Sequence, residues 1–84
     1  MEVNKELREK IFNIINDQLS EESPPEVKIA YQRLTKEGFV DIQSRQLIGQ
    51  CVLVELYEMI KTNRPFDLER YKRNLKSLPR KPDL

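Results

Sequence analysis

Glu55 and Glu58 lie three residues apart, so their carboxylates would face the same side of a helix. Helical bundles use paired carboxylates to bind two iron ions, but such sites also need Glu-x-x-His motifs. The chain contains no histidine, which removes the commonest general base, the usual partner of a nucleophile and the commonest metal ligand. We therefore expect a non-enzymatic protein with no metal and no cofactor, and we interpret the pair as a solvated or salt-bridged helix edge.

Glu55 has a second interpretation, because it lies between Cys51 and Met59 and flanks two apolar stripes of the same helix. A buried, ionised glutamate needs a partner such as an arginine or a tyrosine hydroxyl. The sequence leaves two alternatives open: a partly buried, paired Glu55, or a Glu55 at an exposed edge.

Cys51 is the single cysteine of the chain, and no lysine or arginine lies within four residues of it. Its thiol therefore has no neighbour in the sequence that would make it reactive, and we interpret it as a small core or interface residue. A lone cysteine cannot form an intramolecular disulfide and suits a reducing compartment. We expect a cytoplasmic protein.

Basic residues concentrate near the C-terminus, where residues 70–84 carry six bases against one acid. A patch of lysine and arginine can neutralise phosphates, and the candidate phosphate contacts are Arg70, Arg73, Lys76, Arg80 and Lys81. The alternative is the solvated face of a short helix followed by a tail. No zinc-finger spacing, glycine-rich phosphate loop or aromatic stacking platform accompanies the patch.

Four segments with helical spacing of apolar residues would position these groups, and no segment alternates like a strand. The first is expected over residues 4–19 with Asn4 as N-cap. The second follows a Ser23–Glu26 capping box and ends at a left-handed Gly38. The third spans residues 41–62. The fourth begins at an Asp67 cap, with Phe66 stapled to Tyr71, and ends before Pro79.

The third helix is apolar all round: nine of the thirteen residues 48–60 are apolar, which indicates burial on more than one side. We expect Val52 and Leu56 in the core, and a close helix crossing at Gly49. The main apolar face comprises Ile42, Ile48, Val52, Leu53, Leu56, Met59 and Ile60. A second stripe lies on the far side and comprises Leu47, Cys51 and Val54.

The segments predict an all-α protein, a compact four-helix bundle with a long central third helix. Residues 1–78 would form a single helical domain and residues 79–84 a flexible tail. The longest uncharged run has nine residues, too short for a membrane span of roughly 20, and the N-terminus lacks a signal-peptide hydrophobic region. We therefore expect no membrane segment.

Three short helices rarely enclose a fourth, so the second stripe is predicted to contact another copy of the chain. The candidate interface residues are Leu47, Cys51, Val54, Glu55 and Glu58. The function that follows is a non-catalytic protein-interaction module that forms a homodimer. The alternative is weak nucleic-acid binding through the basic C-terminal helix and tail.

A scaffold of prolines, capping residues and core positions also runs through the chain. It reads PPEVKxxYxRLxxxGF, RQLIG, ELYEMIK and PFDxERYxxxLxxLP, at Pro24–Phe39, Arg45–Gly49, Glu55–Lys61 and Pro65–Pro79. Over roughly residues 19–79 the chain resembles a family of small bacterial proteins classed as a domain of unknown function. The resemblance implies a helical fold and a bacterial source, and it brings no established activity. Relatives often carry histidine early in the third helix, where this chain has Gln43 and Gln46.

Overall fold

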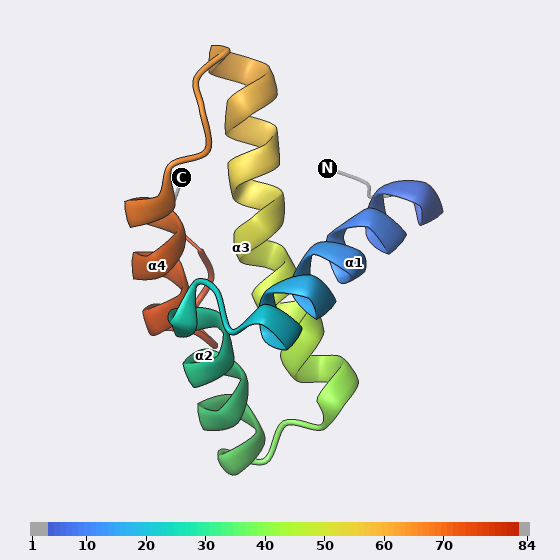
Figure 1. Ribbon diagram of the computed structural model, residues 1–84, viewed down its shortest axis with the longest axis vertical. Coiled ribbons are helices and arrows are strands. Elements are labelled where there is room, and N and C mark those ends of the chain that lie inside the picture. The colour runs from blue at the N-terminus through green and yellow to red at the C-terminus, as the bar shows by residue number, and fades with distance from the viewer. Residues whose placement is uncertain (1–3, 83–84) are drawn as a thin grey trace.

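Four α-helices form the part of the chain that the computed structural model describes, residues 4–82, and no strand occurs in that range (Figure 1). The helices are α1 (Lys5–Glu21), α2 (Pro25–Lys36), α3 (Asp41–Thr62) and α4 (Leu68–Ser77). The helix α3 is the longest, and the other three pack around it (Figure 1). The predicted all-α four-helix bundle with a long third helix is confirmed.

Side chains near the helix starts explain why the chain becomes helical there. The Asn4 side chain accepts a hydrogen bond of 2.8 Å from the Leu7 backbone N–H, as predicted for an N-cap. Asp67 caps α4 in the same way and accepts from the Arg70 N–H at 3.0 Å. At the start of α3, the Gln43 side chain reaches back and accepts from the Val40 N–H at 3.0 Å.

The predicted capping box at the start of α2 is wrong. The N-cap is Pro24, in an extended conformation and without a side-chain hydrogen bond, and Pro25 is the first helical residue. The physical reason is the second proline: its ring disfavours the helical conformation for the residue before it, so the helix cannot include Pro24. Ser23 therefore lies one residue too early to act as the cap.

The end of α2 is a Schellman motif, as the sequence predicts. Gly38 has a φ of +106°, the left-handed region that glycine adopts without strain. The Phe39 N–H donates to the Leu34 carbonyl at 3.1 Å, and the Gly38 N–H donates to the Thr35 carbonyl at 3.2 Å. This motif directs the chain from α2 into α3.

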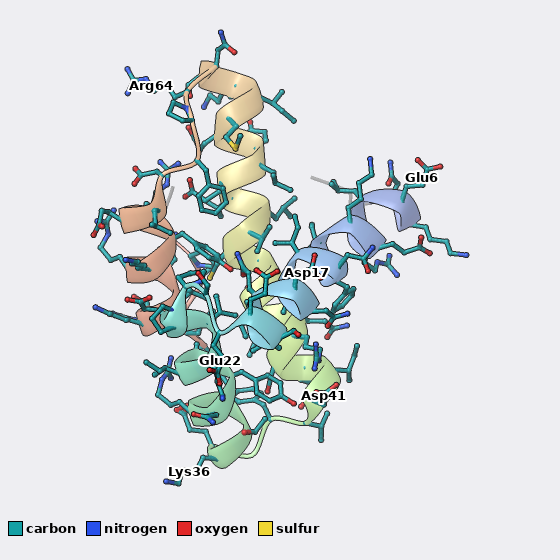
Figure 2. The ribbon with its side chains drawn as sticks, viewed as in Figure 1. Glu6, Asp17, Glu22, Lys36, Asp41 and Arg64 are labelled. Carbon is teal, nitrogen blue, oxygen red and sulfur yellow. The ribbon has the colours of Figure 1, made fainter. Side chains whose placement is uncertain are left out.

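Asp41, at the first turn of α3 (Figure 2), then joins the two helices through side chains. It accepts a hydrogen bond from the Tyr31 hydroxyl of α2, and a second one of 3.0 Å from Arg45 Nε of α3. The hydrogen bond to Asp41 raises the pKa of Tyr31. The Arg45 guanidinium also lies over the Tyr31 ring, 5.4 Å from its centroid.

All four helices contribute buried residues to the core, and α1 crosses α3 at Gly49. A Cβ at this position would lie 3.2 Å from Ile11 Cγ2 and 3.6 Å from Ile15 Cδ1, so glycine allows the two helices to approach closely. The predicted crossing is confirmed. Val52 is fully buried as predicted, whereas Leu56 is only partly buried against the edge of the core.

Parts of the predicted main face of α3, and an apolar residue at the start of α4, are exposed. Ile42, Ile60 and Leu68 all face solvent, and Ile60 has 86% of its surface exposed. Ile60 belongs to the C-terminal end of α3, whereas α1 packs on α3 at Gly49. The N-terminal half of α1 diverges from α3 (Figure 1). An apolar stripe in a sequence does not specify where along its length the covering helix passes.

The arginine Arg33 of α2 terminates α4 across the helix interface. Its guanidinium donates to the Leu78 carbonyl at 2.7 Å and to the Leu75 carbonyl at 3.1 Å, and the Leu75 carbonyl also accepts from the Leu78 backbone N–H at 3.3 Å. Leu78 is buried, so the chain stays docked up to the end of the predicted domain. Flexibility of residues 79–84 stays a prediction, and residues 83–84 of this tail lie outside the described residues.

Candidate interaction surfaces

The predicted second stripe does not form a continuous exposed surface. Cys51 and Glu55 are completely buried within the chain, whereas Leu47, Val54 and Glu58 are partly exposed. The prediction that Cys51 and Glu55 contact a second copy is therefore wrong. The reason is that α4 and the segment before it fold back over this side of α3, as the ion pair between Glu55 and Arg70 demonstrates.

Glu55 is paired on both carboxylate oxygens. Oε2 accepts from Arg70 Nε at 2.6 Å, and Oε1 accepts from Arg70 Nη2 at 3.0 Å. Oε1 also accepts from the Asp67 backbone N–H at 2.9 Å. Of the two alternatives that the sequence leaves open, the structure confirms the buried and paired one. The hydrogen bond to Glu55 raises the pKa of Arg70, and all three contacts hold α4 against α3.

Cys51 lies beside this ion pair in the core. Burial raises the pKa of the Cys51 thiol to about 12, and the negative charge of Glu55 adds to the effect. The thiol is therefore protonated at neutral pH. A protonated thiol is a poor nucleophile and a poor metal ligand, because both roles need the thiolate. The interpretation of Cys51 as a core residue holds, and the interface interpretation does not.

The basic residues of α4 divide into an internal and an external group. Arg70 pairs with Glu55 and is not available for phosphate, which corrects its place among the predicted contacts. Lys72 lies 3.9 Å from a Glu26 carboxylate oxygen of α2. The other four predicted contacts are exposed, and no acidic residue within the described range pairs with them: Arg73, Lys76, Arg80 and Lys81.

A surface with exposed apolar side chains lies on α3 instead, next to α1, and its Leu53, Leu56 and Ile60 belong to the predicted main face. We call it the open face, and it comprises Gln50, Leu53, Leu56, Tyr57 and Ile60. At 100° per residue these positions fall within about 120° of the helix circumference. None carries a charge. Ile60 and Tyr57 are the most exposed apolar members, at 86% and 39%.

A hollow continues the open face onto α1. It has a volume of about 170 Å³, and Leu53 and Gln50 of the open face form part of its wall. The remaining wall is Arg8, Ile11 and Phe12 of α1 and Gln46 and Gly49 of α3. Figure 2 shows the N-terminal end of α1, marked by Glu6, projecting away from the other helices.

Residues that could hold a metal ion do not gather in the described part of the chain: no group of three or more cysteine, aspartate or glutamate side chains occurs there. No described helix is both long and apolar enough to cross a membrane. Comparison with family models, with curated proteins and with solved structures gave no match to this chain. The resemblance of residues 19–79 to a family of unknown function stays a prediction.

Proposed function

We propose that this chain is a non-catalytic protein-interaction module that self-associates through the open face of α3. The observation that carries the proposal is Ile60, an isoleucine with 86% of its surface exposed, on a helix face without charge. Contiguous exposed apolar surface marks interaction sites in proteins of this kind. Burying one such side chain contributes roughly 1.5–3 kcal/mol.

The chemistry of the open face also indicates the class of partner. A nucleic acid or an acidic peptide requires a patch of lysine and arginine, whereas the cations beside this face are two separate ones, Lys61 over the Tyr57 ring and Arg8 in the wall of the hollow. An apolar protein surface is the partner that releases the most free energy here. The lone cysteine fits a reducing compartment, and we place the protein in the bacterial cytoplasm as part of the same proposal.

Light scattering after size exclusion, over a range of protein concentrations, tests self-association. We expect a concentration-dependent dimer, and Ile60→Arg should give a folded monomer. The matched control is Ile29→Arg on α2, which replaces another isoleucine that is 61% exposed and should leave the dimer intact. A wild-type protein that stays monomeric at several hundred micromolar contradicts the proposal.

The stripe predicted from the sequence can be tested in the same experiment. Val54 is partly exposed, and Val54→Arg would disrupt an interface built on Leu47 and Val54. We expect a smaller effect than that of Ile60→Arg, because Cys51 and Glu55 no longer contribute to that stripe. A monomer from Val54→Arg and a dimer from Ile60→Arg would move the interface to the stripe.

A second candidate function, weak nucleic-acid binding, is supported by the exposed and unpaired Arg73, Lys76, Arg80 and Lys81. Four phosphate contacts would give binding to generic DNA and RNA that weakens steeply with salt. Fluorescence anisotropy with labelled oligonucleotides checks this, with Arg73→Glu and Lys76→Glu as the weakening variants. Lys36→Glu, on α2, is the control. Binding that is unaffected by salt or by these substitutions contradicts it.

A further inference from the structure

We propose that the partner at the open face is a second copy of this chain, and that the two α3 helices pack antiparallel with Leu53 of one copy opposite Ile60 of the other. The proposal rests on the proposed self-association and deepens it, because it names the partner, the orientation and the register.

The spacing of the apolar residues on the open face supports a second copy. Leu53, Leu56, Tyr57 and Ile60 follow the spacing i, i+3, i+4, i+7, which is the same when read in either direction. An antiparallel copy therefore places apolar residues opposite apolar residues at all four positions. A two-fold axis between Leu56 and Tyr57 makes the contact isologous, because the contact from Leu53 to Ile60 is repeated from Ile60 to Leu53.

The residues that flank Leu53 and Ile60 fit the same antiparallel register. The polar residue that precedes the set is Gln50, and in the antiparallel register it lies opposite Asn63, the C-cap of α3. Both are uncharged and each can donate and accept hydrogen bonds. The five residues of the open face are uncharged, and the nearest described cation is Lys61, whose ammonium lies 5.8 Å from the centroid of the Tyr57 ring at the edge of the face.

The hollow beside Leu53 provides room for the partner's side chain. In this register Ile60 of the second copy approaches Leu53, which is part of the wall of the hollow of about 170 Å³. A cavity of roughly 150 Å³ holds a benzene molecule, so the space is sufficient for the four-carbon side chain of isoleucine. Ile11 and Phe12 of α1 would then contribute apolar contacts from the other side.

The area of the contact sets the strength that we expect. Two turns of α3 are less than the roughly 800 Å² per partner of a standard interface. The projecting half of α1 has to supply the remainder (Figure 1). We therefore expect a dimer with a Kd of roughly micromolar size rather than an obligate one.

Cysteine substitution tests the register, because a disulfide forms only between Cα atoms closer than about 7 Å. Position 57 lies next to the two-fold axis. In the Tyr57→Cys variant, the cysteines of the two copies should therefore form a disulfide under mild oxidation. In the Ile60→Cys variant, the cysteines of the two copies would be offset along the helix axis by about seven residues, or roughly 10 Å. They should therefore not crosslink. The double variant Leu53→Cys/Ile60→Cys should crosslink. The native Cys51 does not interfere, since it is buried and its pKa is raised.

Each outcome of this experiment is decisive. Crosslinking of Tyr57→Cys and of the double variant, but not of Ile60→Cys or of the exposed control Ile29→Cys, supports the register. Crosslinking of Ile60→Cys together with Tyr57→Cys indicates parallel helices, in which each residue faces its own copy, and overturns it. A wild-type dimer in which Tyr57→Cys fails to crosslink overturns the register but leaves the proposed function standing. A monomeric wild-type protein contradicts both. Circular dichroism confirms that each variant is folded.

Discussion

Arg70 of α4 donates two hydrogen bonds, of 2.6 and 3.0 Å, to the carboxylate of Glu55, which is fully buried on α3. The two residues are fifteen positions apart in the sequence, and the loop between them is fastened by a further bond from the Asp67 N–H to the same carboxylate. The charge of Glu55 is thus satisfied by one neighbouring element, and both oxygens of its carboxylate accept hydrogen bonds. The pair holds α4 against α3.

Removing one partner of this pair should destabilise the fold strongly. Arg70→Ala leaves a buried carboxylate without its counter-charge, and such a change costs about 3–5 kcal/mol. Urea unfolding followed by circular dichroism measures the loss. The control is Lys28→Ala, which removes an ion pair between two exposed side chains, Lys28 and Glu22, and should have a much smaller effect. Equal effects of the two substitutions would mean that Glu55 is hydrated rather than buried.

Glu55 illustrates what the sequence can and cannot predict. The need for a partner follows from one residue in an apolar helix, and the structure confirms that need. The identity of the partner does not follow, because it depends on how the chain turns between α3 and α4. The same limit explains the error at Cys51: a stripe beside Glu55 looks uncovered until α4 is placed over it.

Local signals in the sequence were more informative than distant ones. The bounds of α3 agree with the prediction at both ends. Gly38 is a strong stop signal for α2, just before α3 begins, and Asn63–Arg64–Pro65 is a strong stop signal for α3 itself. The cap of α2 was missed because two consecutive prolines constrain one another. The open face was missed for another reason: the apolar pattern predicts a buried stripe, but the divergence of α1 from α3 beyond Gly49 is a property of the whole fold.

Arg33 makes a second long-range attachment that no sequence pattern indicated. Hydrogen bonds from a charged donor contribute about 1.5–3 kcal/mol, and Arg33 gives two of them to carbonyls at the end of α4. We predict that Arg33→Ala lowers the free energy of unfolding by about 2 kcal/mol. Thermal unfolding compared with that of Arg73→Ala, an exposed arginine of α4 without an ion pair, checks the value. A loss no larger than the control's would contradict the capping role.

Cys51 predicts a loss of stability in alkaline solution. Its folded pKa of about 12 lies above the ordinary value of 9.0, so the folded state retains a proton that the unfolded state releases. The stabilisation is fully present below pH 9 and is lost as the pH rises toward 12. Urea unfolding at pH 8 and pH 10.5 measures the decrease, and Cys51→Ala should reduce it. Burial also raises the pKa of Tyr71, so part of the decrease should persist in that variant.

Leu56 and Leu75 offer a matched pair of leucines that separates the core from the proposed interface. Leu75 is fully buried, whereas Leu56 is partly buried beneath the open face. Leu75→Ala should therefore cost about 2–5 kcal/mol, whatever the protein concentration. Leu56→Ala should cost less than Leu75→Ala in dilute solution, where the chain is monomeric.

The difference between the two variants should shrink as the protein concentration rises. Association stabilises the folded state by mass action, and a dimer that buries Leu56 loses that stabilisation when the side chain is truncated. Thermal unfolding at about 5 and 500 micromolar, a range chosen to bracket a roughly micromolar Kd, measures the effect. The wild type and Leu75→Ala should unfold at higher temperature in the concentrated sample, and Leu56→Ala should gain less. If Leu56→Ala gains as much as the wild type, the open face takes no part in self-association.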